Sequence, residues 1–173
     1  MVQAGEQTER IIAQMKEAEV RDLRAYVGVS KVILNLQKPQ IPRGIVEIQN
    51  FGKTPAYKVR QWVGIAVHSY PLAAALPESP NPNPASVSVI FPGIKNANLV
   101  DLKKELPPNT VVGTQEITVY VYGRITYEDA FKNERQSNYR FFFGGPSGGR
   151  VYHDGNGPLL GAMYPDSEGN DAT

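Results

Sequence analysis

The fourteen residues from 50 to 63 (NFGKTPAYKVRQWV) constrain the fold more than any other part of the sequence. Asn50 can bond its own backbone across a bend, and Gly52 can adopt a positive φ. Pro55 holds its φ near about −65° and keeps the residue before it extended. Apolar and polar side chains alternate after this turn. The segment therefore predicts the end of one strand, an irregular turn at Asn50, Gly52 and Pro55, and the start of a second strand.

The same two-residue alternation runs through most of the chain after residue 25. It is clearest at 116–127, where an expected inward row alternates with an outward row: Ile117, Val119, Val121, Ile125 and Tyr127 against Thr118, Tyr120, Tyr122, Arg124 and Thr126. A strand is likewise expected over 57–69. Its inward row would consist of Tyr57, Val59, Val63, Ile65 and Val67. Trp62 would lie on the opposite face. Other expected strands cover 25–36 (with a bulge near Ser30 or Lys31), 45–50, 85–91, 97–106, 136–143 and 159–164.

About seven to eight short strands with turns and no helix between them predict a mainly-β fold, an antiparallel immunoglobulin-like β-sandwich. One α-helix is expected before it, over 8–24, with Thr8 as its cap. Its apolar stripe of Ile12, Met15 and Leu23 is interrupted by Glu19. We expect an N-terminal helix or linker over 1–24, the sandwich over 25–164 and a flexible tail over 165–173. The proline-rich segment 71–84 is expected to be an exposed loop.

Composition limits the classes of function. Lys and Arg total 18 against 17 Asp and Glu, with the signs interspersed, so no basic surface for nucleic acid is expected. With no cysteine, disulfides, thiolate metal sites and thiol nucleophiles are excluded. No stretch has the ~18 to 20 apolar residues that cross a bilayer, so the chain as given is expected to be soluble.

Three segments carry a resemblance: 24–27 (RAYV), 50–59 (NFGKTPAYKV), and 122–127 (YGRITY) followed by Asp129, Ala130, Phe131 and Arg135. Together they resemble a group of uncharacterised bacterial proteins, in which a membrane helix and a helical linker precede one immunoglobulin-like sandwich. The resemblance implies a membrane-anchored location at the cell envelope, and attachment to the membrane would require an anchor upstream of this sequence. The chain differs from the group in lacking that anchor, in having Lys132 where a glycine usually turns the hairpin, and in having no cysteine near its last strands.

The sequence around Ser147 (GPSGG) formally matches the Gly-x-Ser-x-Gly motif of serine hydrolases, and His153 and Asp154 follow it. That motif needs a strand leading directly into a helix, and the acid between serine and histidine in the chain. Neither condition is met, so a glycine-rich loop is favoured and a hydrolase using Ser147 is an unfavoured alternative.

The remaining polar groups do not have the spacing of a metal site or a glycosidase. His68 and His153 are far apart in sequence, and the loop at 154–157 lacks the glutamate that completes a calcium loop. Asp166, Glu168 and Asp171 are interpreted as solvated charges of the tail. Glu128 and Asp129 are adjacent on a turn and cannot flank one glycosidic bond.

Three aromatic residues, Trp62, Tyr120 and Tyr122, fall on the faces opposite the apolar rows of their strands. If exposed together, they would form a binding surface for sugar rings or a protein. If covered by the helix or by the 71–84 loop, they would be ordinary packing, which is the favoured interpretation. We expect a non-enzymatic binding or assembly module with no cofactor and no metal. Its expected partner is another protein or a second copy, bound through the helix or a sheet face, and a carbohydrate-binding module is the main alternative.

Overall fold

The structure is a computed structural model, which describes residues 2–38, 40–73, 75–78, 87–153, 155 and 157–173. Pro80, Pro82 and Pro84 of the predicted loop, the first two residues of the strand expected at 85–91, and Asp154 lie outside these ranges. The elements in chain order are α1 (Val2–Leu23), β1 (Val27–Asn35), β2 (Arg43–Asn50), β3 (Ala56–His68), β4 (Ser88–Ile90), β5 (Lys95–Asp101), β6 (Thr118–Glu128), β7 (Glu134–Phe143), the 3₁₀ turn η1 (Gly145–Ser147), β8 (Val151–His153), β9 (Leu159–Ala162), β10 (Tyr164–Pro165) and β11 (Asp171–Ala172).

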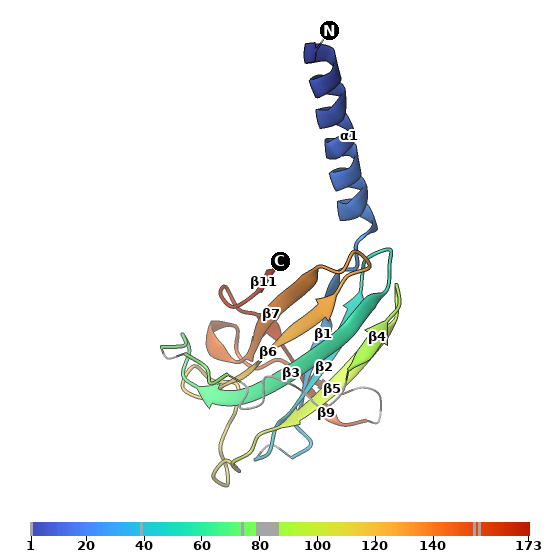
Figure 1. The fold of residues 1–173 in the computed structure, drawn as a ribbon. Helices are drawn as coiled ribbons and strands as arrows, with labels where there is room; N and C mark the ends of the chain where they lie inside the picture. The colour runs from blue at the N-terminus through green and yellow to red at the C-terminus, as the bar shows by residue number, and fades with distance from the viewer. Residues whose placement is uncertain (1, 39, 74, 79–86, 154, 156) are drawn as a thin grey trace.

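The strands form two antiparallel sheets packed face to face (Figure 1). The five-stranded sheet has the order β5-β2-β1-β9-β8, and the six-stranded sheet has the order β10-β7-β6-β3-β4 with β11 also on β7. The chain is thus mainly β, a sandwich with one N-terminal helix, as the alternation predicts. Strands β8, β10 and β11 have only two or three residues each, too short for any periodicity in the sequence to reveal them.

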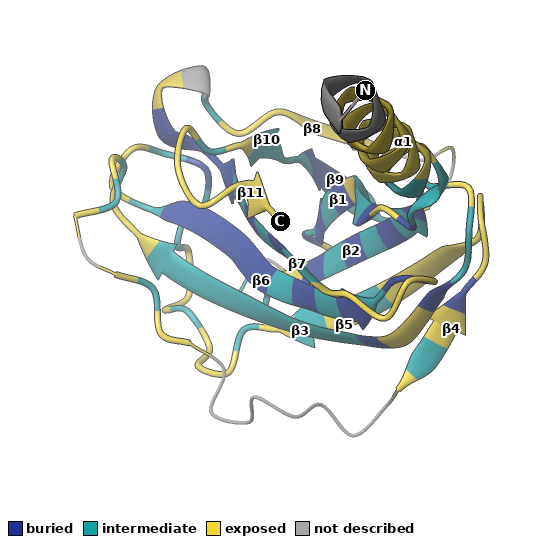
Figure 2. Ribbon diagram, turned by 45° about the horizontal axis from the view of Figure 1, so that its top comes forward, coloured by how far each residue is buried: buried dark blue, intermediate teal, exposed yellow. Residues whose placement is uncertain are grey.

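The core lies between the inner faces of the two sheets (Figure 2). The predicted inward residues Val46 and Ile48 of β2 are buried, as are those of β6 from Val119 to Tyr127. The predicted bulge in β1 is confirmed between Val29 and Lys31. Burial of such aliphatic rows contributes about 25 cal/mol per Å² of apolar surface, which makes this layer the main source of stability.

Tyr57 was expected in the inward row of β3, but its side chain is 37% exposed. The register of β3 shifts between Tyr57 and Arg60, where Lys58 has a φ of 50°. One extra residue at such a bulge turns the preceding side chains to the other face. Val59 is therefore buried while Tyr57 is not.

Helix α1 projects from one end of the sandwich (Figure 1) and begins at Val2, six residues before the predicted cap at Thr8. Its side chains from Thr8 to Glu19 are all exposed, including Ile11, Ile12 and Met15 at 50%, 48% and 67%. In the part of the chain described here, no helix combines the length and the apolar character that crossing a membrane requires.

The last segment does not form the single strand expected at 159–164. Strand β9 belongs to the five-stranded sheet and β10 to the six-stranded sheet, so the chain passes from one layer to the other at Met163. The tail at 165–173, expected to be flexible, lies along β7: Ala172 pairs with Ser137, and the backbone N–H of Thr173 donates to Gln136 O at 2.9 Å.

Candidate functional site

The outer face of the six-stranded sheet brings most of the candidate residues together, because antiparallel register places them in rows across β3, β6 and β7. The rows change from polar to aromatic along the strands. Beginning near α1, they are Arg60–Thr126–Gln136, Trp62–Arg124–Asn138, Gly64–Tyr122–Arg140 and Ala66–Tyr120–Phe142.

The aromatic end of this face, here called the aromatic cluster, contains Tyr120, Tyr122 and Phe142 at 0%, 8% and 7% exposure. Tyr70, Leu72 and Leu76, from the segment after β3, pack over it. The Tyr122 hydroxyl donates to Pro77 O at 3.0 Å, and the Tyr120 hydroxyl donates to Ser69 O at 3.3 Å. Burial raises the pKa of both tyrosines.

Trp62 lies at the border of the aromatic cluster, with its ring edge-on to Tyr122 at 5.8 Å between centroids. Gly64 leaves room for this arrangement, since a Cβ there would lie 2.5 Å from the Tyr122 ring. Tyr120 and Tyr122 are therefore covered by the segment after β3, and only Trp62 of the three keeps an intermediate exposure. The three rings do not form one open surface.

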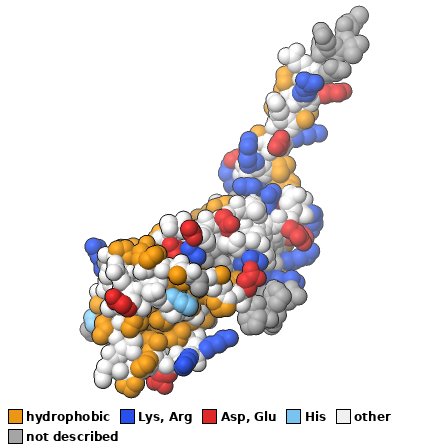
Figure 3. Space-filling model, turned by 90° about the vertical axis from the view of Figure 1, so that its left-hand side faces the viewer, with side chains coloured by type: hydrophobic (Ala, Val, Ile, Leu, Met, Phe, Trp, Pro, Cys, Tyr) orange, Lys and Arg blue, Asp and Glu red, His pale blue; other side chains and the backbone are white. Residues whose placement is uncertain are grey.

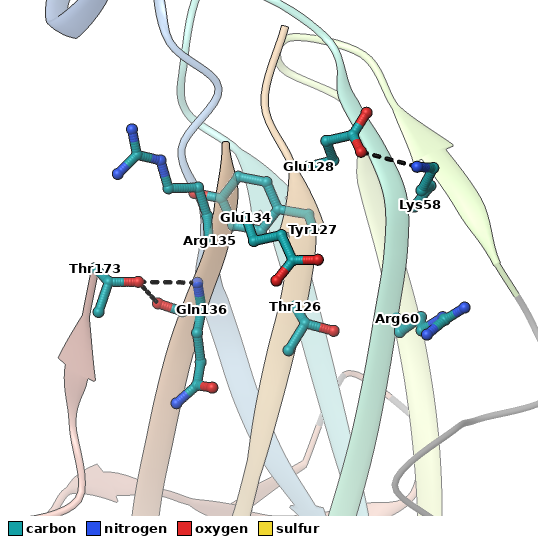
Figure 4. A pocket seen from close by; sticks show the side chains of 9 residues that line it. All are labelled: Lys58, Arg60, Thr126, Tyr127, Glu128, Glu134, Arg135, Gln136 and Thr173. Atoms are coloured by element: carbon teal, nitrogen blue, oxygen red, sulfur yellow. Dashed lines mark hydrogen bonds and ion pairs between the residues drawn. The ribbon is translucent and has the colours of Figure 1, made fainter. Parts of the chain in front are cut away.

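The polar end of the face contains a groove of about 650 Å³, here called the polar groove (Figure 4). Its lining comes from three strands and the tail: Lys58, Arg60, Thr126, Tyr127, Glu128, Glu134, Arg135, Gln136 and Thr173. Figure 3, which views the molecule from the side, shows both charge signs along α1 and hydrophobic side chains gathered at the end of the sandwich farthest from the helix. The groove opens at the end from which α1 leaves.

Ion pairs hold most charges of the polar groove. Lys58 Nζ lies 2.8 Å from Glu128 Oε2, and Lys132 Nζ lies 3.1 Å from Glu128 Oε1. Hydrogen bonds from Lys58 and then Lys132 lower the pKa of Glu128. Arg135 Nε lies 3.0 Å from a carboxylate oxygen of Asp129. The groove thus presents charges of both signs together with hydroxyl and amide groups.

The described backbone around Ser147 does not form the strand, sharp turn and α-helix that the serine hydrolase motif requires. Ser147 ends the 3₁₀ turn η1, which follows β7 and leads to β8, so no α-helix follows the motif. His153 is exposed on β8, and its Nδ1 lies 3.5 Å from Gly157 O. His68 is exposed at the end of β3.

The acidic residues of the tail contact two side chains of β7, Arg140 and Asn138. Arg140 Nε lies 2.7 Å from Asp166 Oδ2, and Arg140 also pairs with Glu168 at 3.5 Å. Asn138 Nδ2 donates to Asp171 Oδ1 at 2.6 Å. The interpretation of these acids as solvated charges is wrong for Asp166, whose side chain is 8% exposed. Among the described residues, no three His, Asp or Glu side chains are grouped as metal ligands would be.

The predicted turn residues form a buried hydrogen-bonded junction next to α1. Asn50 is fully buried; its Oδ1 accepts from the N–H groups of Tyr26 and Gly52 at 3.2 and 2.9 Å. Its Nδ2 donates to the carbonyl oxygens of Thr54 and Ile90 at 2.8 and 2.9 Å. The side chain therefore joins the residue before β1, the turn and β4, and its amide makes two accepted and two donated hydrogen bonds.

Gly52 is required for a different reason from the one predicted. Its φ is not positive. A Cβ at this position would instead lie 2.3 Å from Arg24 O and 2.5 Å from Tyr26 N. The glycine thus allows the link between α1 and β1 to pass against the turn.

Sequence reasoning missed Arg60, Thr126 and Gln136, which form one row in the polar groove. Their alternation marks them as outward-facing, but the register that aligns them depends on the bulge at Lys58. No pattern in the sequence signals that bulge.

Fold and surface together define a two-sheet antiparallel β-sandwich with a projecting helix and a polar groove at the helix end. The chain matches no protein-family model, and no curated protein or solved structure is significantly similar to it.

Proposed function

We propose that this chain is a non-enzymatic binding or assembly module of a bacterial cell envelope, in which α1 mediates association and the sandwich, of immunoglobulin-like type, carries the binding surface. The observation that carries the proposal is the exposure of Ile11, Ile12 and Met15 on a helix that leaves the sandwich instead of packing on it.

A helix of this kind needs a partner. Isolated helices are marginal in water, and most helices in proteins are stabilised by packing an apolar face. The contact between Lys53 Nζ and Asp22 Oδ2, 2.6 Å long, is between exposed side chains, and such pairs contribute less than about 1 kcal/mol. Pairing with a second α1 would cover Ile12 and Met15 and supply the missing stabilisation.

Charge is compatible with such self-association. Between residues 7 and 23 the helix has three basic and four acidic side chains: Arg10, Lys16, Arg21, Glu9, Glu17, Glu19 and Asp22. Two copies would therefore meet with mixed rather than like charge.

Location at the envelope is supported by the resemblance carried by residues 24–27, 50–59 and 122–135, which also supports the immunoglobulin-like assignment.

The proposal is tested on the full chain by replacing Ile12→Lys and Met15→Lys together, with Gln14→Lys as control because Gln14 is also exposed. For the wild type and the control, helical ellipticity should be reduced in dilute protein and should rise as the protein concentration is increased. The double variant should lose this rise. If it keeps full helicity at every concentration, α1 is stable alone and its role in assembly is refuted.

A carbohydrate-binding module is the second candidate, favoured by Trp62, which borders both the aromatic cluster and the row containing Arg60 and Thr126. A single accessible indole beside polar groups can stack on one sugar ring. A glycan array should then show binding by the wild type that Trp62→Ala abolishes. Equal signals for both proteins would remove this candidate.

A further inference from the structure

Strand β5 forms one end of the five-stranded sheet, and in the described residues it pairs only with β2. Its register with β2 is regular from Lys95 to Asp101. The flanking ladder bonds, Asn50 N–H to Ile94 O and Leu102 N–H to Pro42 O, show that even-numbered residues point their backbone groups toward β2. The N–H and C=O groups of Lys95, Ala97, Leu99 and Asp101 therefore point away from the sheet.

The side chains of these four residues lie on the outer face of the sheet. Leu99 is 63% exposed and ends a cross-strand apolar row with Ala162, Ile33 and Ile45. One charged pair lies on each side of this row. Arg43 Nε is 2.6 Å from Asp101 Oδ1, and Lys95 Nζ is 2.9 Å from Glu47 Oε1.

Edge strands of soluble proteins are commonly protected by charged side chains, especially lysine, by proline, by bulges or by very short length. Strand β5 has seven residues, contains no proline and is paired without a register shift, and its two charges, Lys95 and Asp101, are already paired with opposite charges on β2. It is therefore a template on which another strand can add.

We propose that two copies of this chain associate through antiparallel pairing of β5 with β5, about a twofold axis at Asn98. The sequence of the strand, KNANLVD, is self-complementary in charge when paired in this way. Lys95 lies opposite the partner's Asp101, and Asp101 lies opposite the partner's Lys95. Leu99 lies opposite the partner's Ala97.

Backbone geometry favours the same register. Residues 95, 97, 99 and 101 all point their backbone groups away from β2, and pairing about Asn98 matches them only with one another. Each matched pair can exchange two hydrogen bonds, as narrow pairs of an antiparallel ladder do. The register also uses the whole strand, whereas a shift by two residues leaves the charged ends without opposite charges.

The side chains around the axis are complementary as well. The charges alternate in sign along a line that crosses the interface: Glu47, Lys95, the partner's Asp101 and the partner's Arg43. Leu99 and Ile45 continue the apolar row toward the partner's Ala97. The result is a continuous ten-stranded sheet, formed from two five-stranded sheets.

The test uses the full chain and two charge reversals, Lys95→Glu and Asp101→Lys. Each variant alone places two like-charged pairs across the interface, and we expect sedimentation velocity to show self-association weakened by roughly tenfold or more. An equimolar mixture restores opposite charges at both positions, because Glu at 95 faces Lys at 101 and the native pair remains. The mixture should therefore associate more strongly than either variant alone, while the within-chain pairs with Glu47 and Arg43 stay like-charged.

Hydrogen exchange supplies a second measurement. Amides of Ala97 and Leu99 should be protected as concentration rises in the wild type and in the mixture, and exchange rapidly in each variant alone. This readout separates β5 pairing from association through α1, which changes helicity instead. Thermal unfolding serves as the control for folding. If a well-folded mixture remains as dissociated as the single variants, or if the wild type never protects these amides, the proposed pairing is wrong.

Discussion

At the scale of single residues, Asp129 in the turn between β6 and β7 is a second buried polar side chain held by several hydrogen bonds. Its side chain is fully buried. One carboxylate oxygen accepts from the N–H groups of Phe131 and Asn133, both at 2.9 Å, and the other accepts from Arg135 Nε at 3.0 Å. Burial by itself raises the pKa of Asp129, but the bonds from Asn133, Arg135 and Phe131 outweigh it and the pKa is lowered.

Replacing Asp129→Asn should therefore destabilise the protein by about 3 kcal/mol at neutral pH, because Arg135 loses a buried partner and one acceptor becomes a donor. A lowered folded pKa means that the stabilisation is present above the unfolded pKa of about 3.9 and is lost as pH falls through the folded pKa. Urea unfolding at several pH values should show the difference between wild type and variant shrinking below about pH 4. A difference that stays constant with pH would contradict the ionised role.

At the scale of elements, the turn of the β6–β7 hairpin holds one residue in a strained backbone conformation. Lys132 has a φ of 67°, in the left-handed region that glycine adopts freely. Its Nζ lies 5.7 Å from the centroid of the Tyr57 ring as well as near Glu128. These contacts partly offset the cost of the backbone conformation.

Two substitutions separate backbone strain from side-chain contacts. Lys132→Ala removes the contacts and keeps the strain, whereas Lys132→Gly removes both. We expect the glycine variant to be more stable than the alanine variant by about 1 kcal/mol, measured from urea unfolding midpoints. Equal midpoints would show that this position tolerates a left-handed conformation without cost.

At the scale of the whole molecule, the chain end runs along the β7 edge of the six-stranded sheet. Arg140 on β7 binds Asp166, and its backbone N–H donates to Asn170 Oδ1 at 3.0 Å. The backbone N–H of Asp166 donates to Arg140 O at 2.9 Å. Arg140 thus anchors the segment between β10 and β11.

Arg140→Ala should release this segment while leaving the sandwich folded. We expect local opening of residues 166–173 to become easier by about 1 kcal/mol, since the ion pair is partly buried. Hydrogen exchange should accelerate in this segment and stay unchanged in β2 and β6. Arg150→Ala, at an exposed position after η1, is the matched control. Unchanged exchange in the Arg140 variant would show that β11 pairing alone holds the tail.

Much of the architecture was predictable because alternation reports directly on burial. Val46, Ile48, Val121 and Ile125 are buried as expected, and the β1 bulge near Ser30 appears in the sequence as a change of phase. Alternation does not reveal what covers the outer face. Tyr122 occupies an outward position of β6, yet the segment after β3 buries it.

The candidate site was less predictable than the fold. Trp62 was placed on the correct face, and Asn50 was placed in a turn with the backbone bond that the structure contains. The polar groove was not predicted, since it depends on the shift of β3 at Lys58 and on the tail reaching β7. Both are non-local events without a periodic signal.

The sequence by itself determined the layers: strands of alternating polarity have one apolar face to bury, and with no helix between these strands a second sheet covers it. It also determined the turn after Asn50, because Asn50 accepts a local bond from the Gly52 N–H and Pro55 fixes its own φ. Tertiary structure alone decided which outward side chains remained accessible, which glycine was needed for close approach, and which strand was left at the edge. These properties depend on contacts between segments distant in the chain, and no local pattern encodes such contacts.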